Sequence, residues 1–148
     1  LGGSEMCIRD SLERLGDYCK NVSLRVQALE EIPPVEIKNE ILRMTVMVQG
    51  QLKRVIDAYV TKNKEKALEV RNADAAIDQH YQLIYNQIIE DIKNKPNKIK
   101  TLANTKLLFT IKTIERAGDH ITNIAEEIFY TVTGETLTTP RPKGESEK

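Results

Sequence analysis

The sequence predicts an all-helical protein, and three observations support this fold class. Apolar residues recur every three or four positions along most of the chain, which is the period of an amphipathic helix. No segment shows the period of two that is typical of a half-buried strand. The breaks between periodic segments carry Pro, Asn or Gly, which end or cap helices. We therefore expect long helices joined by short turns, so that neighbouring helices are antiparallel.

The periodic segments define four helices, at residues 12–31, 35–61, 64–93 and 98–133. Pro33 and Pro34 end the first of them. Asn63 is suited to cap the helix that follows the second turn. Pro96 breaks the pattern before the fourth helix, and Gly134 follows its last residue, where glycine is favoured.

The organisation along the chain follows from these helices. With 148 residues, the chain suits one domain or slightly more. Residues 35–134 are expected to form a three-helix bundle, and the helix within residues 12–32 is left over, as if it belonged to another bundle. Residues 1–11 match nothing that follows and are interpreted as a non-native leader. Residues 135–148 are polar and rich in Pro and Gly, so we expect a disordered tail.

Charge and composition exclude several classes of protein. The 22 basic and 22 acidic residues balance, so no excess of positive charge favours nucleic acid or a membrane surface. No apolar run approaches the ~20 residues of a membrane-spanning helix, and no signal peptide is recognisable. A cytoplasmic location is the default expectation. Cys7 and Cys19 do not indicate a disulfide framework or a zinc site.

A ten-residue segment occurs twice in the chain. Residues 13–22 align with residues 115–124, and Glu, Arg, Gly, Asp and Asn recur at the same places. Five identities in ten positions, most of them polar, indicate an internal duplication. On this interpretation each unit is a three-helix bundle. The first helix is then the last helix of a bundle whose other helices are missing from this sequence.

The second copy of this segment contains an acidic pair that costs stability. Glu115 and Asp119 lie four residues apart, on one face of a helix, where like charges repel. Gly118, between them, costs about 1 kcal/mol relative to alanine in a helix interior. Asp74 and Asp78 form a second pair, on the apolar face of the third helix. An antiparallel bundle can bring the two pairs opposite each other.

Four converging carboxylates require protons, basic partners or a metal ion. Oxygen ligands of this kind suit iron, manganese, magnesium or zinc. A cation site at Asp74, Asp78, Glu115 and Asp119 is therefore our hypothesis, although an isolated acidic pair is usually a solvated face. Three alternatives stay open: a metal-binding interaction protein, a carboxylate-bridged metalloenzyme, and a metal-free helical adaptor in which arginines such as Arg116 neutralise the acids.

With these residues in view, the chain resembles the PhoU family of phosphate-signalling regulators. The resemblance rests on residues 115–120 (Glu-Arg-Ala-Gly-Asp-His), residues 123–126 (Asn-Ile-Ala-Glu), residues 132–135 (Val-Thr-Gly-Glu) and the acidic segment 74–78. It covers about residues 12–135 and implies two repeated bundles, of which the first is truncated here.

The resemblance also implies a function. Family members are non-enzymatic cytoplasmic regulators that couple the phosphate ABC-transporter ATPase to a sensor histidine kinase and repress the response to phosphate starvation. They are usually homodimers, and some bind metal through their acidic motifs. Carried over to this chain, the metal role falls on Asp74, Asp78, Glu115 and Asp119. It also falls on Glu13 and Asp17 of the first copy. The remaining candidates, for a supporting role around the metal, are Asn123 and Arg116.

Overall fold

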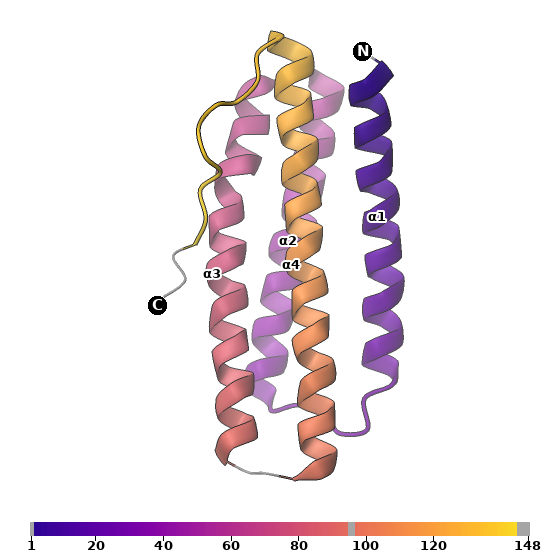
Figure 1. Cartoon of the computed structure of the whole chain (residues 1–148), viewed down its shortest axis with the longest axis vertical. Helices are drawn as coiled ribbons and strands as arrows, with labels where there is room; N and C mark the ends of the chain where they lie inside the picture. Colours follow the sequence, from indigo (N-terminus) through magenta and orange to yellow (C-terminus); the bar gives the residue numbers. More distant parts are fainter. Residues whose placement is uncertain (1, 95–96, 145–148) are drawn as a thin grey trace.

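The computed structural model describes residues 2–94 and 97–144 of the chain (Figure 1). In these ranges it contains helices and no strand, which confirms the predicted all-helical fold class. The helices are α1 (Gly2–Gln27), α2 (Val35–Thr61), α3 (Lys64–Asn94) and α4 (Lys98–Thr133). The predicted ranges of α2 and α4 are correct, and α3 ends one residue later than expected.

Helices α2, α3 and α4 form an antiparallel three-helix bundle in which each helix packs against the other two. The backbone of α1 lies close to that of α4, on the side of α4 that faces away from α3 (Figure 1), and side chains of α1 also pack beside α2. The bundle and the additional helix are therefore arranged as predicted. Within the described ranges, no helix combines the length and the apolar character needed to cross a membrane.

The turns of the bundle are set by the residues that the sequence pattern indicated. Asn63 Oδ1 accepts a hydrogen bond of 2.9 Å from the backbone N–H of Lys66, which confirms its capping role. Gly134 ends α4 with a φ of 73°, a left-handed conformation that favours glycine. Asn97 caps the start of α4 by accepting a hydrogen bond from Ile99 N at 2.9 Å. The predicted break at residues 95 and 96 lies outside the described residues.

The core consists of two apolar clusters stacked along the bundle. One is formed by α2, α3 and α4 and includes the fully buried side chains of Met44, Ile84 and Ile111. The other also receives Ile8 and Leu15 from α1. Burial of this apolar surface is the main force that holds the helices together.

Helix α1 begins at Gly2, well before the start that we expected near residue 12. Residues 3–11 contain no proline, and Ile8 lies two turns before Leu15, so the buried stripe continues into them. Other apolar side chains of α1, such as Leu12, Leu24 and Val26, remain exposed. This agrees with the prediction that the first helix would lack neighbours.

The two copies of the repeated segment meet where α1 packs against α4. The hydroxyl of Tyr18 forms a hydrogen bond of 3.1 Å with His120 Nε2, and these residues occupy equivalent positions, 102 residues apart. Two antiparallel helices related by an approximate twofold axis bring equivalent residues together at that axis. Burial lowers the pKa of His120, opposed by Asp119 and assisted by Arg14, so the ring is neutral near pH 7.

Replacing Tyr18 with phenylalanine is expected to lower the free energy of unfolding by about 0.5 to 1.5 kcal/mol, because the hydrogen bond is lost. Urea denaturation measures the change. Tyr59→Phe, at an exposed position on α2, is the control and should leave stability unchanged. Equal effects of the two substitutions would show that the contact between Tyr18 and His120 contributes nothing.

The segment after α4 turns back and runs along α3 (Figure 1). We expected disorder over residues 135–148. In residues 135–144 the structure shows no helix or strand, yet it shows defined contacts with α3 and α4. Polar anchors, rather than apolar burial, hold this segment in place. Residues 145–148 lie outside the described residues.

Candidate cation site between α3 and α4

The four acidic residues of the predicted site lie where α3 packs against α4. Asp74 and Asp78 come from α3, and Glu115 and Asp119 come from α4. Asp74 is 3% exposed, whereas the other three are half-buried. Asp78, Glu115 and Asp119 line a cavity of about 220 Å³ at the surface of the bundle. The structure therefore places three of the four acids around one cavity, whereas Asp74 is buried against Gly118 of α4.

Gly118 is the position that allows α4 to approach Asp74 closely. A Cβ atom added there would lie 3.1 Å from Asp74 Oδ1 and 3.5 Å from two side-chain carbons of Ile77. The first distance is tighter than ordinary van der Waals contact. The glycine inside the repeated segment thus makes room for a buried carboxyl group, which accounts for a residue that is unfavourable in a helix interior.

Substituting Gly118 with alanine is expected to give no gain in stability, although alanine is the better helix former. The equivalent glycine of the first copy, Gly16, would have open space around an added Cβ and provides a matched control. We expect Gly16→Ala to raise the free energy of unfolding by up to about 1 kcal/mol. In Gly118→Ala this gain is offset by displacement of the Asp74 carboxyl. Equal gains in thermal denaturation would contradict the close contact.

Burial and mutual repulsion favour the protonated form of the aspartates contributed by α3. The pKa of Asp74 is raised to about 7, first by burial and then by the charges of Asp78 and Asp119. Arg141 and the hydroxyl of Thr122 act in the opposite direction. The pKa of Asp78 is also raised, by burial and by Asp119. A cation placed among these carboxyl groups would relieve the repulsion.

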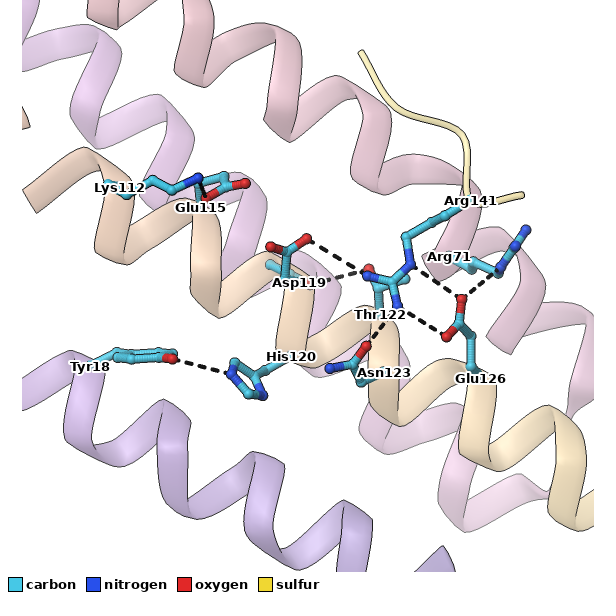
Figure 2. A network of polar contacts seen from close by, with 11 residues as sticks. Tyr18, Arg71, Lys112, Glu115, Asp119, His120, Thr122, Asn123, Glu126 and Arg141 are labelled. Carbon is cyan, nitrogen blue, oxygen red and sulfur yellow. Dashed lines mark hydrogen bonds and ion pairs between the residues drawn. The ribbon is translucent and has the colours of Figure 1, made fainter. Parts of the chain in front are cut away.

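Basic side chains already lie beside two of the acids (Figure 2). Lys112 Nζ is 2.6 Å from Glu115 Oε2, one turn away on α4. Arg141, from the segment after α4, places Nη1 3.7 Å from Asp119 Oδ1. Arg141 Nη2 also donates a hydrogen bond of 2.6 Å to Asn123 Oδ1. The predicted supporting residue Asn123 therefore holds the arginine in this structure.

A second ion-pair cluster adjoins the groove and was not predicted from the sequence. Arg71 of α3, only 4% exposed, donates from Nε to Glu126 Oε1 at 3.0 Å. Arg141 donates to both carboxylate oxygens of Glu126, at 3.2 and 3.0 Å (Figure 2). Burial alone would raise the pKa of Glu126, but hydrogen bonds from Arg141 and Arg71 lower it below its usual value.

One signal in the sequence could have identified part of this cluster. Arg71, Asp74 and Asp78 are spaced by three and four residues, so they share one face of α3. That face also carries Val70 and Ile77, which makes an arginine on its edge a candidate for a buried ion pair. No periodic pattern pointed to Arg141, which lies in an irregular segment.

The remaining predicted residues lie elsewhere. Glu13 and Asp17 are exposed on α1, which packs on the other side of α4 (Figure 1). Arg116 is exposed on α4, and the acids of the groove are paired by Lys112 and Arg141 instead. In the described part of the chain, no three His, Cys, Asp or Glu side chains are grouped closely enough to hold a metal ion. The arrangement seen is a groove in which basic side chains neutralise the acids.

The fold and this groove define a class: helical-bundle proteins with paired acidic motifs on adjacent helices and a duplicated helix sequence. The chain belongs to the PhoU family, because the PhoU domain matches residues 41–128, more than half of its length. The matched region includes all four acids of the groove.

Curated relatives and a solved structure agree with this assignment. The phosphate-specific transport system accessory protein PhoU homologue of Caulobacter vibrioides (strain NA1000 / CB15N) is 44% identical over 134 residues, which cover 90% of this chain. The homologue of Rhizobium meliloti (strain 1021) is 37% identical over 137 residues, which cover 92% of this chain. In both comparisons the chain spans 57% of the length of the relative.

The crystal structure of the phosphate transport system regulatory protein PhoU from Streptococcus pneumoniae has a similar fold. The TM-score is 0.82 at 28% sequence identity, and the match covers 92% of this chain and 63% of that structure. The relatives are named as accessory or regulatory proteins and not as enzymes.

Proposed function

We propose that this chain is part of a cytoplasmic regulator of phosphate homeostasis that represses phosphate uptake and phosphate-starvation signalling. The observation that carries the proposal is the family membership, together with relatives named as accessory proteins of a phosphate-specific transport system. The regulator acts by binding. Its partners are the ATPase of the phosphate ABC transporter and a sensor histidine kinase, and it works as a homodimer.

The second part of the proposal concerns a metal ion in the groove between α3 and α4. The donor set fits a hard or borderline cation such as manganese, iron, magnesium or zinc, because carboxylate oxygens are the ligands these ions accept. The charge of Asp119 raises the pKa of both Asp74 and Asp78, so added positive charge would stabilise the three carboxylates together. Glu115 lines the same cavity and would be the fourth carboxylate beside the ion.

Such an ion would supply positive charge that joins α3 to α4. Asp78 and Asp119, which line the cavity, would hold the ion together with the buried Asp74. Gly118 keeps the space that the Asp74 carboxyl needs. Through this link, metal content would set how firmly the two helices are held together.

A specific observation supports a second candidate, a helical adaptor that needs no metal. Lys112 and Arg141 pair with Glu115 and Asp119, and the ion pairs of Arg71 and Arg141 with Glu126 continue along the helices. In that case the acidic motifs would serve only to fix the helices and the segment after α4. The regulatory function is the same for both candidates.

Affinity purification from phosphate-replete cells tests the regulatory function. A tagged copy of the protein is expected to recover a phosphate-transporter ATPase or a sensor histidine kinase, and less of either from phosphate-starved cells. A test variant carries Asp74→Lys, which places a positive charge in the buried position beside Gly118. This charge should disturb the groove and reduce recovery of the partners. Recovery of neither partner class under both conditions would contradict the proposal.

A further inference from the structure

The segment after α4 lies along the groove between α3 and α4 as a short irregular peptide. Residues 139–144, called here the strap, form no helix or strand and reach the cavity lined by Asp78 and Asp119. Pro140 and Pro142 fix their own φ angles and disfavour the helical region for the residue before each of them. The sequence of the strap therefore favours an extended conformation even without the groove.

The first contact of the strap is with a buried donor of α3. Arg71 is 4% exposed, and its Nε donates a hydrogen bond to Glu126 of α4. Its Nη2 donates a hydrogen bond of 2.5 Å to the backbone carbonyl of Thr139. A buried guanidinium N–H that lacks an acceptor is costly, and here the acceptor is a peptide backbone instead of a helix side chain. Any chain that presents a carbonyl at this point would satisfy Arg71, whatever its side chain.

The second contact recognises an arginine two residues further along the strap. Arg141 donates from Nε and Nη2 to the two carboxylate oxygens of Glu126, at 3.2 and 3.0 Å (Figure 2). Its Nη2 also donates a hydrogen bond of 2.6 Å to Asn123 Oδ1, and Nη1 lies 3.7 Å from Asp119 Oδ1. A planar guanidinium fits this paired arrangement, whereas lysine offers only a single point of charge. Three side chains of α4 therefore surround one arginine.

The third contact requires a glycine. A Cβ added at Gly144 would lie 2.9 Å from the backbone oxygen of Ala75 and 2.9 Å from the backbone nitrogen of Gln79. Both are backbone atoms of α3 and have little freedom to move. The backbone N–H of Gly144 also donates a hydrogen bond to Asp78. The chain can approach this carboxylate because residue 144 has no side chain.

Polar contacts and opposite charge, not apolar burial, hold the strap in the groove. Thr139, Pro140, Pro142 and Lys143 are all exposed. Half-exposed ion pairs and single backbone hydrogen bonds each contribute little, because water competes for the same groups. The groove is acidic and the strap is basic, which favours encounter between them. Another chain with the same chemistry could therefore take the place of the strap.

We propose that the groove between α3 and α4 is a docking surface for an extended basic segment of a partner protein, and that the strap occupies it as an internal stand-in. The segment that fits carries an arginine and, three residues later, a glycine. Attachment to α4 gives the strap a high effective concentration, so the partner must bind more tightly than the strap alone to displace it. The inference needs no metal ion and goes beyond the proposed function, because it names the chemistry of a partner segment.

Fluorescence anisotropy with a labelled synthetic peptide of residues 136–144, in buffer with a chelator, tests the docking surface. The full chain carrying Gly144→Ala has its own strap displaced and leaves the groove unchanged. We expect this variant to bind the peptide about tenfold more tightly than the wild type, whose groove is already filled. Gly16→Ala, a glycine substitution on α1 with open space around the added Cβ, is the matched control and should bind the peptide as the wild type does.

Two further changes test how the groove recognises its occupant. A peptide carrying Arg141→Lys keeps the charge but loses the paired hydrogen bonds, and should bind the Gly144→Ala protein about tenfold more weakly. Adding Glu126→Gln to that protein should remove binding of the unchanged peptide, with circular dichroism confirming that the helices remain.

Three results would overturn the inference. They are no binding of the peptide to the Gly144→Ala protein, equal binding of the two peptides, and a wild type that binds as tightly as Gly144→Ala. Analytical ultracentrifugation distinguishes another occupant. A wild type that dimerises, beside an Arg141→Gln variant that stays monomeric, would assign the groove to the strap of a second copy and overturn the assignment to a partner. Recovery of the partners and metal content test the proposed function separately.

Discussion

Replacing Arg71 with alanine is expected to lower the free energy of unfolding by about 2 to 4 kcal/mol. The side chain is 4% exposed and binds both Glu126 and the carbonyl of Thr139. Its removal leaves a cavity between α3 and α4. It also takes from the half-buried Glu126 carboxylate one of its two arginine partners. The loss is moderated because Arg141 remains beside Glu126. Urea denaturation gives the free energy directly.

Arg71→Met separates the two contributions. Methionine keeps most of the apolar stem but donates no hydrogen bond, so the difference between the two variants measures packing. Hydrogen exchange in residues 139–144 should increase in both, because the anchor at Thr139 is lost. If both variants are as stable as the wild type and hydrogen exchange in residues 139–144 is unchanged, the ion-pair cluster does not hold the segment after α4.

The second large effect is a dependence of stability on pH that comes from Asp74. An aspartate in the unfolded chain has a pKa near 3.8, whereas in the fold Asp74 has a pKa of about 7. Between these values the folded state binds more protons than the unfolded state, so the free energy of unfolding falls as pH rises and levels off above about pH 7. Asp74→Asn keeps the shape of the neutral carboxyl group. It therefore removes the fall in the free energy of unfolding that Asp74 causes as pH rises.

We expect Asp74→Asn to be more stable than the wild type by about 2 to 4 kcal/mol at pH 8, with the difference disappearing toward pH 3. Thermal and urea denaturation in the presence of a chelator measure this without contribution from metal. Asp17→Asn, at an exposed position of the first copy, is the control and should change little at any pH. A difference that is constant with pH would contradict a proton held by Asp74.

The helices and the acidic groove could be predicted from the sequence because both depend on local spacing. Pro34, Asn63 and Gly134 fix the ends of helices through backbone chemistry that acts within a few residues. Asp74 and Asp78 lie on the apolar face of their helix, and antiparallel packing determines which face of α4 they meet. The unfavourable Gly118 within the helix was itself a signal of a close contact.

The position of residues 139–144 could not be predicted from local spacing. It depends on single long-range contacts, such as the bond from Arg71 to Thr139, which leave no periodic pattern in the sequence. Low apolar content led us to expect disorder, but two arginines that share Glu126 anchor the segment. The start of α1 was missed for a related reason, since one buried residue, Ile8, extends the stripe of Leu15.

Metal content is the most direct test of the claim that the acidic groove is a cation site. The wild type and a variant carrying Asp78→Ala and Asp119→Ala are dialysed against Mn²⁺, washed and analysed for bound metal. The variant keeps the buried Asp74, and circular dichroism checks that both remain helical. We predict that the wild type retains Mn²⁺ and that the variant loses it. Equal metal content in the two proteins, or none in either, would contradict the cation site.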